Sequence, residues 1–402
     1  MFYMSTVISP FKNHLPVRIE FGEGAAQKLA GTLASLKAER ALLVIDAGLE
    51  KYNPQVADAL TALTQSGIEL SQFVKEAGEP TTEVVDAVAE VIISSNVGAV
   101  IALGGGSVID SAKAGRLCAQ HRCRFTDLNQ LKLEERYPEP VIDLIAVPTT
   151  AGTGSEVSGG AVISDKAAGT KTGIANPSLR PQYAIVDPLL THSLSAQITA
   201  FTGIDALAQA IAGMVAKCRT PIGDAIALEA IRYAGRSLVT AVKDGGNAVA
   251  RSEMACASLM AGLTMNISDC TAEHSLGQAL GGRYGVPHGL TIGVVLAETL
   301  ERERHHVPEQ LERVADALGV PADGTSDGSR AVRGIHEILS ELDFPVLSSI
   351  GVSDADVEQL TELALADFFI TQSPEPWSAA EVGAVYRAAL AVSTRECAKA
   401  GA

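Results

Sequence analysis

Residues 100–113 read VIALGGGSVIDSAK, and this stretch predicts the centre of the fold. The apolar run Val100–Leu103 is typical of a buried strand, glycines follow it, and Val108–Cys118 has the pattern of a helix. Glycines between a strand and a helix let the backbone approach a diphosphate, and the helix N-terminus offers free N–H groups. Such glycines also occur for steric reasons alone, so this turn by itself supports both interpretations equally.

The first half of the chain repeats this alternation of strand and helix. Short β-branched runs occur at Val17–Phe21, Ala41–Ile45, Leu70–Val74, Gly98–Leu103 and Leu144–Val147. Helical patterns lie between them at Gly24–Leu36, Asn53–Ser66 and Thr81–Ser94. The alternation predicts a parallel, Rossmann-like sheet with helices on both faces.

After about Pro188 the strand-like runs stop, and long segments rich in Ala and Leu follow. The clearest helical segments are Ala196–Ala216, Pro221–Val242, Asn247–Asn266 and Ala272–Gly282. We therefore expect an α/β dinucleotide-binding domain over residues 1–190 and an all-α domain over residues 191–402. A cleft between the two domains is the expected ligand site.

The composition excludes some partners. Lys and Arg number 31 against 47 Asp and Glu, and the net charge of −16 argues against nucleic acid or an anionic membrane. The N-terminal sequence MFYMSTVISPFKNHLP lacks the pattern of an export signal, and we find no apolar run of the roughly 18 residues that a membrane helix needs. We expect a cytoplasmic protein. The cysteines show no CxxC spacing, which favours free thiols: Cys118, Cys123, Cys218, Cys256, Cys270 and Cys397.

Two further features lie where predicted strands end. Residues 148–157, PTTAGTGSEV, offer small hydroxyl groups and backbone donors at the carboxyl end of a strand, where open α/β sheets bind ligands. Asp46 ends an earlier strand, and an acid there can accept hydrogen bonds from an adenosine ribose while repelling a 2′-phosphate. This predicts NAD rather than NADP. The structural alternatives are a polar loop that caps the next helix and an Asp that caps a turn.

Polar residues in the helical half suggest a metal site. Asp205 and Gln209 are four residues apart, one turn along a predicted helix, and His274 and His288 lie in glycine-rich segments downstream. One carboxylate and two imidazoles can hold Zn²⁺ or Fe²⁺ and leave a position open for a substrate oxygen. The alternatives are hydrogen-bonded core histidines, a capping Asp205 and a merely polar Gln209.

Four segments in this order resemble the iron-containing (group III) alcohol dehydrogenase family, and the similarity covers most of the chain. The segments are GGGSVIDSAK (104–113), PTTAGTGSEVS (148–158), TGIDALAQAI (202–211) and HSLGQALGGRYGVPHG (274–289). The resemblance implies an NAD-dependent oxidoreductase that interconverts a small alcohol and its aldehyde or ketone. A divalent metal would polarise the substrate oxygen, and hydride would pass to or from nicotinamide C4. Family members often form dimers through N-terminal strands, here Val17–Phe21.

The resemblance also assigns residues. Those implied in NAD binding are Asp46, Gly104, Gly105, Gly106, Ser107, Asp110, Thr149, Thr150, Thr153 and Lys171. In the family the lysine that matches Lys171 follows the hairpin that comes after the hydroxyl-rich loop. Those implied in metal binding are Asp205, Gln209, His274 and His288. His288 and Gln278 are the candidate catalytic positions, because the family commonly has a proton-transferring His where this chain has Gln278.

The sequence departs from the family at two imidazoles, since Gln209 and Gln278 both stand where His is usual. An amide oxygen is a weaker ligand than imidazole, so we expect weaker retention of Fe²⁺ or Zn²⁺. An amide cannot act as a general acid or base, which leaves water, a ribose hydroxyl or a substrate group to carry the proton.

These departures keep other functions open. One is a metal-independent reductase of the maleylacetate reductase type, and another is an NAD-binding protein without turnover. A lyase like dehydroquinate synthase shares the two-domain architecture, but PTTAGTGSE fits the alcohol dehydrogenases better.

Overall fold

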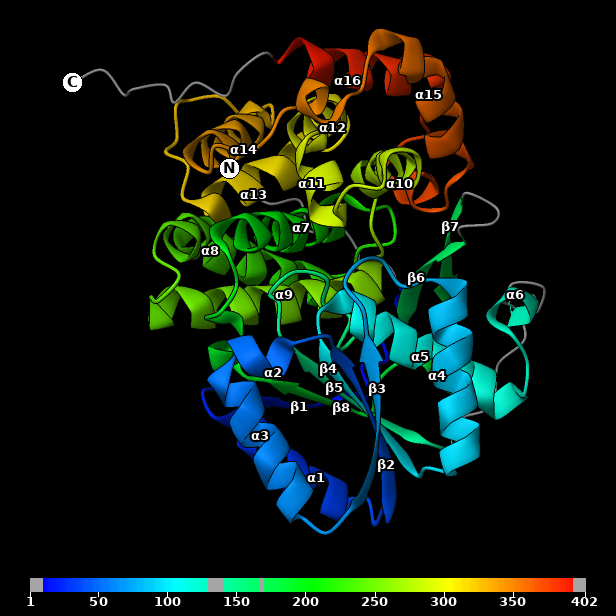
Figure 1. Cartoon of the computed structure of the whole chain (residues 1–402). Helices are drawn as coiled ribbons and strands as arrows, with labels where there is room; N and C mark the ends of the chain where they lie inside the picture. The colour runs from blue at the N-terminus through cyan, green and yellow to red at the C-terminus, as the bar shows by residue number, and fades with distance from the viewer. Residues whose placement is uncertain (1–9, 129–140, 166–169, 393–402) are drawn as a thin grey trace.

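The computed structural model describes residues 10–128, 141–165 and 170–392. Within these residues an α/β part and a helical part are stacked on each other (Figure 1). The expectation about the first residues rests partly on positions 1–9, and the free thiol expected at Cys397 also falls outside the described residues.

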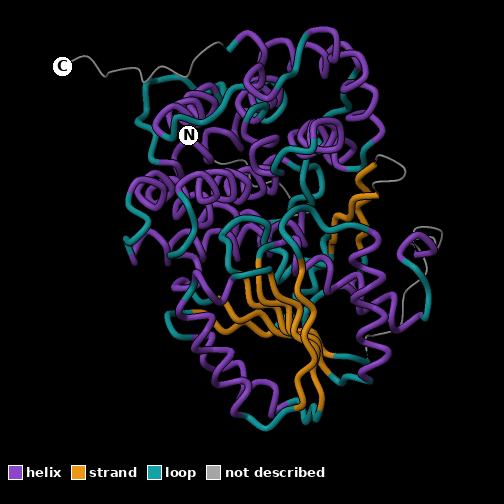
Figure 2. The backbone as a smooth tube through the Cα atoms, in the orientation of Figure 1, coloured by secondary structure: helices purple, strands orange, loops and turns teal. Residues whose placement is uncertain are grey.

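The α/β part is built on one parallel sheet (Figure 2). Its order is β1-β8-β5-β4-β2-β3, and each neighbouring pair is parallel. The prediction of a parallel sheet is therefore confirmed. The strands are β1 (Arg18–Phe21), β2 (Arg40–Asp46), β3 (Glu69–Lys75), β4 (Ala99–Gly104), β5 (Asp143–Pro148) and β8 (Tyr183–Val186).

Helices cover both faces of this sheet. One face carries the 3-10 helix η1 (Ala25–Lys28), α1 (Leu29–Ser35) and α3 (Pro54–Gln65), and the other carries α4 (Thr82–Ser95) and α5 (Gly106–His121). Leu42 and Val44 of β2 belong to the core under α4 and α5, whereas Leu43 and Ile45 belong to the core under α1 and α3. Successive strand residues point to opposite faces, so a continuous apolar run fits a strand that is buried on both sides. The short helices α2 (Leu49–Tyr52) and α6 (Phe125–Leu128) complete this part.

Three strands were missing from the expected set. The strands β6 (Gly160–Asp165) and β7 (Thr170–Ala175) form an antiparallel hairpin outside the main sheet, and β8 is the third. Strand β8 has only 4 residues, and Gly160 and Gly173 weaken the β-branched signal of the hairpin. One detail is corrected: Lys171 lies inside the second strand of the hairpin and does not follow it.

No strand follows Val186 in the described part of the chain, which confirms the all-α second half. Short 3-10 turns connect some of the helices, including η3 (Pro188–Thr191) and η6 (Phe369–Gln372). The α-helices are α7 (Ala196–Val215), α8 (Pro221–Lys243), α9 (Ala248–Ser268), α10 (Ala272–Tyr284), α11 (His288–Gly293), α12 (Leu296–Glu303), α13 (Pro308–Leu318), α14 (Ser329–Glu341), α15 (Val357–Ala366) and α16 (Ala379–Ala391).

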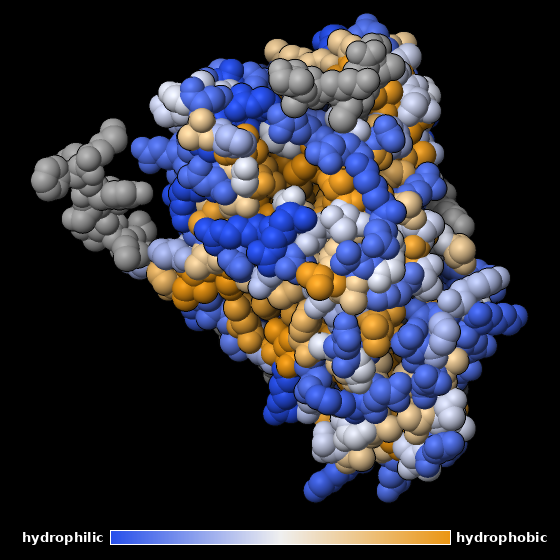
Figure 3. All heavy atoms as spheres, turned by 90° about the vertical axis from the view of Figure 1, so that its left-hand side faces the viewer, coloured by the Kyte–Doolittle hydropathy of each residue, from blue (hydrophilic) through white to orange (hydrophobic). Residues whose placement is uncertain are grey.

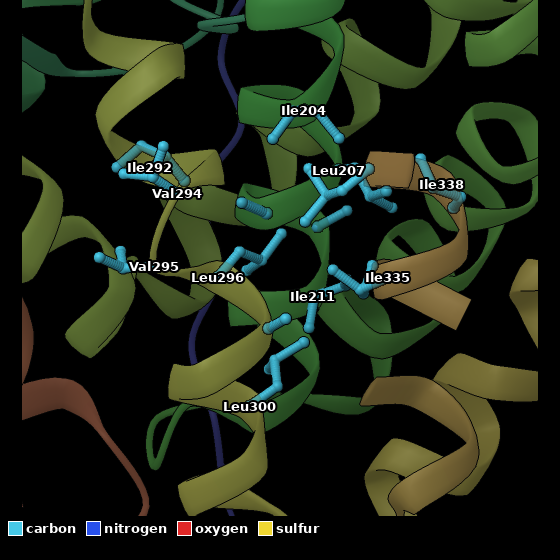
Figure 4. Close-up of a cluster of buried hydrophobic side chains, with 14 of the residues drawn as sticks. Ile204, Leu207, Ile211, Ile292, Val294, Val295, Leu296, Leu300, Ile335 and Ile338 are labelled. Carbon is cyan, nitrogen blue, oxygen red and sulfur yellow. The ribbon is translucent and has the colours of Figure 1, made fainter. Parts of the chain in front are cut away.

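Helix α7 is the central helix of this half. Its side chains Ile204, Leu207 and Ile211 pack against apolar residues of α12 and α14 (Figure 4). This corrects one expectation, because α7 is long and apolar enough to cross a membrane by length and composition, with a mean hydropathy of 1.4. Of that window 89% is buried inside the protein, so α7 serves here as a core helix.

A carboxyl group is buried in the same half of the molecule. Glu303, at the end of α12, is 1% exposed and accepts a hydrogen bond from the indole Nε1–H of Trp377 at 3.0 Å. Arg302 Nη1 lies 3.4 Å from its other oxygen. Burial raises the pKa of Glu303 to about 7, although Arg302 and Trp377 act in the opposite direction.

We predict that Glu303 makes stability depend on pH. The folded state holds this proton up to about pH 7, whereas the ordinary pKa is 4.5. Its contribution to the free energy of unfolding is therefore complete below about pH 4.5 and is lost as the pH rises through about 7. Trp377 is the only tryptophan of the chain, so its fluorescence should titrate with a midpoint near 7. Glu303→Gln should abolish this titration and flatten the pH dependence of urea unfolding. An equal titration in the variant would contradict the assignment.

Candidate active site

The glycine turn and the hydroxyl-rich loop meet at one edge of the sheet. Gly104 at the end of β4 pairs in register with Pro148 at the end of β5, and the Thr149 N–H donates to the Gly104 carbonyl at 3.0 Å. Thr149 is buried, and Thr150 and Thr153 are partly exposed beside the turn. A Cβ at Gly106 would lie 2.7 Å from Thr153 Cγ2, which no real Cβ tolerates. Gly104 and Gly106 are thus sterically required, whereas a Cβ at Gly105 would make only ordinary contacts, and the three glycines leave the N-terminus of α5 open to a ligand.

Asp46 lies directly beside this turn. It ends β2, the neighbour of β4, and its Oδ2 accepts a hydrogen bond from the Gly105 N–H at 3.2 Å. Burial raises the pKa of Asp46, while this N–H and the Lys75 ammonium work to lower it. The residue therefore braces the turn and also stands where an acid could meet a bound nucleotide.

Asp110 faces the protein interior. Its Oδ1 accepts from the Ser155 hydroxyl at 2.6 Å, and its Oδ2 accepts from the Val162 N–H at 2.9 Å. The ammonium of Lys113, one turn further along α5, donates to Ser155 and to the Gly160 carbonyl, both at 2.8 Å. Burial lowers the pKa of Lys113 to about 8, although Asp110 raises it. These contacts tie α5 to the hydroxyl-rich loop and to the hairpin.

The same loop is fixed to the helical half. The side chain of Asn266, on α9, donates to the Val157 carbonyl at 2.6 Å and accepts from the Gly159 N–H at 3.1 Å. The loop after β5 and the helical half are therefore joined by partly buried hydrogen bonds.

The four residues predicted to bind a metal come from three helices. Asp205 and Gln209 lie on α7, His274 lies in the first turn of α10, and His288 begins α11. Asp205 Oδ1 is 3.5 Å from His274 Nε2 and 3.6 Å from His288 Nε2. Ligand atoms of these three residues all lie within 4.8 Å of one another.

Several polar atoms at this point lack a partner. Asp205 Oδ1, Gln209 Oε1 and His274 Nε2 are buried without a hydrogen bond among the described residues. Buried polar groups are nearly always satisfied, so a cluster of unsatisfied lone-pair atoms suits a cation. The donor set, one carboxylate, two imidazoles and an amide, fits Fe²⁺ or Zn²⁺.

Charge also favours a cation there. Burial opposes the ionisation of Asp205, but the imidazoles of His288 and His274 hold its pKa below the ordinary value. Burial works to lower the pKa of His274, yet Cys270 and the carboxylates of Asp205 and Glu273 hold it well above the ordinary value. A metal ion would displace the proton that the raised pKa keeps on His274, and the ion would then attract Asp205 in its place.

Around the site lie residues that the sequence predicted and two, Glu79 and Phe369, that it did not. The side chain of His288 is 31% exposed, which leaves one side open. Lys171 Nζ lies 3.3 Å from Glu79 Oε1, and both charges act on His288. Gln278 is buried one helical turn after His274. The ring centroid of Phe369 lies 6.0 Å from that of His274. Glu79 and Phe369 were not among the predicted site residues, and no spacing rule places either of them here.

A dinucleotide-type turn joined to a carboxylate–imidazole centre is the arrangement of a metal-dependent dehydrogenase. Comparison with known proteins agrees. The model for "iron-containing alcohol dehydrogenase" matches residues 16–188, and the model for the C-terminal domain of that family matches residues 199–390. The chain belongs to the iron-containing alcohol dehydrogenase family.

Individual relatives are alcohol dehydrogenases. A choline dehydrogenase of Bacillus subtilis is 34% identical over 88% of each chain. An NAD-dependent methanol dehydrogenase of Bacillus methanolicus is 31% identical over 94% of this chain and 99% of its own. A solved 1,3-propanediol oxidoreductase superposes with a TM-score of 0.89 at 30% identity, covering 95% of this chain and 100% of its own. The chain is thus an oxidoreductase acting on alcohols and aldehydes, and neither the lyase nor the metal-independent reductase is favoured.

The contact between α11 and α7 generates a prediction. A Cβ at Gly289 would stand 2.0 Å from the backbone oxygen of Phe201, four residues before Asp205. Gly289→Ala must therefore push His288 away from Asp205. We expect a loss of about 1–3 kcal/mol in the free energy of unfolding, measured in urea, and weaker Zn²⁺ binding.

Gly282→Ala is the matched control. Gly282 is exposed on α10, and a Cβ there would meet nothing within 4 Å. Alanine is favoured over glycine in a helix by about 0.5–1 kcal/mol, so this variant should be neutral or slightly stabilised. Equal behaviour of the two variants would show that the α7–α11 contact does not control the site.

Proposed function

We propose that this enzyme is an NAD-dependent alcohol dehydrogenase with one Fe²⁺ or Zn²⁺ held by Asp205, Gln209, His274 and His288. The observation that carries the proposal is that ligand atoms of Asp205, His274 and His288 lie within 4.8 Å of one another, while the buried, unpaired Gln209 Oε1 belongs to the next turn of the helix that carries Asp205. When bound, the metal would act as a Lewis acid on the substrate oxygen, and NAD would accept or deliver the hydride.

The coenzyme would lie along the edge formed by the glycine turn. The N–H groups at the start of α5 would receive the diphosphate, because glycines keep this approach open. The carboxylate oxygen of Asp46 that does not accept from the Gly105 N–H would accept hydrogen bonds from the adenosine ribose. The Thr149, Thr150 and Thr153 loop and Lys171 would hold the nicotinamide half. Asp110 would support the coenzyme site from the protein interior, through the hydrogen bond that it accepts from the Ser155 hydroxyl.

The other residues would orient the substrate and move the proton. His288, partly exposed, would border the substrate beside the metal. Gln278 can donate and accept hydrogen bonds but cannot change its protonation state, so it would position a water molecule or a ribose hydroxyl. The proton would then leave through that water or hydroxyl.

Metal dependence tests this function. We expect the purified chain to bind about one Fe²⁺ or Zn²⁺, measured by metal analysis, and to reduce NAD with a panel of small alcohols. The named relatives suggest choline, methanol and 1,3-propanediol as members of the panel. Chelation should abolish activity, and Asp205→Asn should lower it by about 100-fold or more. The exposed Asp323→Asn is the control and should leave activity unchanged. Full activity in completely metal-free enzyme would refute the proposal.

Coenzyme choice tests the assignment of Asp46. Like charges in an interface cost several kcal/mol, so kcat/KM with NAD should exceed that with NADP by on the order of 100-fold. Asp46→Asn removes the charge but keeps an oxygen that can accept from the Gly105 N–H. This variant should narrow the preference at least about tenfold, and an unchanged ratio would place the ribose elsewhere.

We also propose that the chain divides into domains 1–190 and 191–402 and works as a cytoplasmic homodimer. Strand β1 pairs only with β8 among the described residues, and Ile19 and Phe21 on it are 41% and 38% exposed. Hydrophobic side chains also lie between polar ones on the face drawn in Figure 3. A second copy would cover the free edge of β1. Light scattering should give twice 41.7 kDa, and Ile19→Lys should give a monomer. A wild-type monomer would refute the dimer.

A further inference from the structure

A second carboxylate lies behind His274, on the side away from Asp205. Glu273 Oε1 is 2.7 Å from His274 Nδ1, and Glu273 is 2% exposed. The two ring nitrogens of His274 therefore face two different carboxylates, Glu273 at Nδ1 and Asp205 at Nε2. Both carboxylates are deeply buried.

The local backbone holds Glu273 in place. The Thr271 N–H donates to Glu273 Oε1 at 3.2 Å, and the Thr271 hydroxyl donates to Oε2. Glu273 also lies in the first turn of the 13-residue helix α10, where free N–H groups favour negative charge. These contacts offset part of the cost of burying a carboxylate.

This hydrogen bond determines which nitrogen is available as a ligand. A carboxylate can only accept, so Nδ1 must carry the proton that is shared with Glu273. Nε2 is then the nitrogen that can offer a lone pair on the side of Asp205 and His288. A carboxylate on the far nitrogen also makes the imidazole a more basic ligand. In a dry interior this charge acts strongly, because little solvent screens it.

Glu273 gains importance from the ligand at position 209. Gln209 is a neutral amide where an imidazole is usual in the family, and an amide oxygen binds these metals more weakly. A strengthened His274 can restore part of the lost affinity.

We propose that Glu273 is a positioning residue for the metal centre: it fixes the tautomer and orientation of His274 and increases its strength as a ligand. The inference rests on the proposed function, since it presupposes a metal at Asp205 and His274. It predicts that affinity for the metal depends on a residue that does not touch the metal.

The test compares metal binding in wild type and Glu273→Gln. The dissociation constant for Zn²⁺ is measured by competition with a chromophoric chelator, and the visible spectrum of the Co²⁺ form reports the geometry of the ligands. The glutamine keeps the size and one acceptor oxygen but loses the charge. We expect binding to weaken by about 10–100-fold and the Co²⁺ bands to shift. Glu273→Asp, which keeps the charge, should recover part of the loss.

Two further variants separate positioning from general damage. Thr271→Val removes one support of the Glu273 carboxylate and should weaken Zn²⁺ binding less than Glu273→Gln does. Glu303→Gln removes another buried carboxyl of the helical half, one that contacts no proposed ligand. The affinity of this variant for Zn²⁺ should stay within about threefold of that of wild type, a smaller change than the loss of a residue that supports a ligand causes. Thermal melts of the metal-free proteins establish that each variant is folded.

The outcomes distinguish this proposal from the proposed function. If wild type binds Zn²⁺ and Glu273→Gln binds it equally tightly with an unchanged Co²⁺ spectrum, the positioning role is overturned and the metal centre stands. If Glu303→Gln weakens binding as much as Glu273→Gln, the effect is one of general buried charge and the positioning role is again overturned. If wild type binds no metal, the proposed centre itself is refuted, and the role of Glu273 with it.

Discussion

The burial of Asp205 in an apolar helix is the constraint on which the active site depends. Helix α7 is the most apolar long helix among the described residues, and Asp205 on it is 2% exposed with one oxygen unpaired. A lone buried carboxylate is costly, so neighbouring helices must supply polar partners for it. Helices α10 and α11 bring His274 and His288, and the rest of α7 is held rigid by apolar packing (Figure 4). The helical half can thus be understood as a support for one carboxylate.

The second requirement is that the coenzyme edge stays in register with that carboxylate. The sheet provides the edge, because β4 and β5 end side by side. Hydrogen bonds from Lys113 and Asn266 then connect the loop after β5 to α5 on one side and to α9 on the other. Hydride transfer tolerates little misplacement, so the hydrogen bonds of Asn266, which join the two halves, help to keep the coenzyme edge in place.

The sequence predicted the parts that depend on periodicity and on ordered motifs. The apolar run Val100–Leu103 indicated a strand buried on both faces, and the structure has it as β4. Asp205, His274 and His288, three of the four residues that the family resemblance implied at a metal site, lie together in the structure, and their role as ligands stays a prediction. The β-branched runs did not mark β8, which has only 4 residues, or the two hairpin strands, which contain Gly160 and Gly173. Glu79 and Phe369 could not be found, since their approach to the site depends on loops that pack from distant parts of the chain.

The proposed metal centre raises the question of how a site could bind a metal when Gln209 and Gln278 stand where the family resemblance implies imidazoles. Charge offers an answer, because a metal site is defined by the sum of its ligands and their partners. Gln209 takes the place of a stronger neutral ligand, whereas Glu273 adds a buried negative charge that is hydrogen-bonded to His274. Part of the affinity for the metal would then come from residues that hold the ligands, such as Glu273, and less from the ligands themselves. Such a site would hold its metal through electrostatics more than through ligand number, and its affinity would be tuned by residues that a motif search ignores.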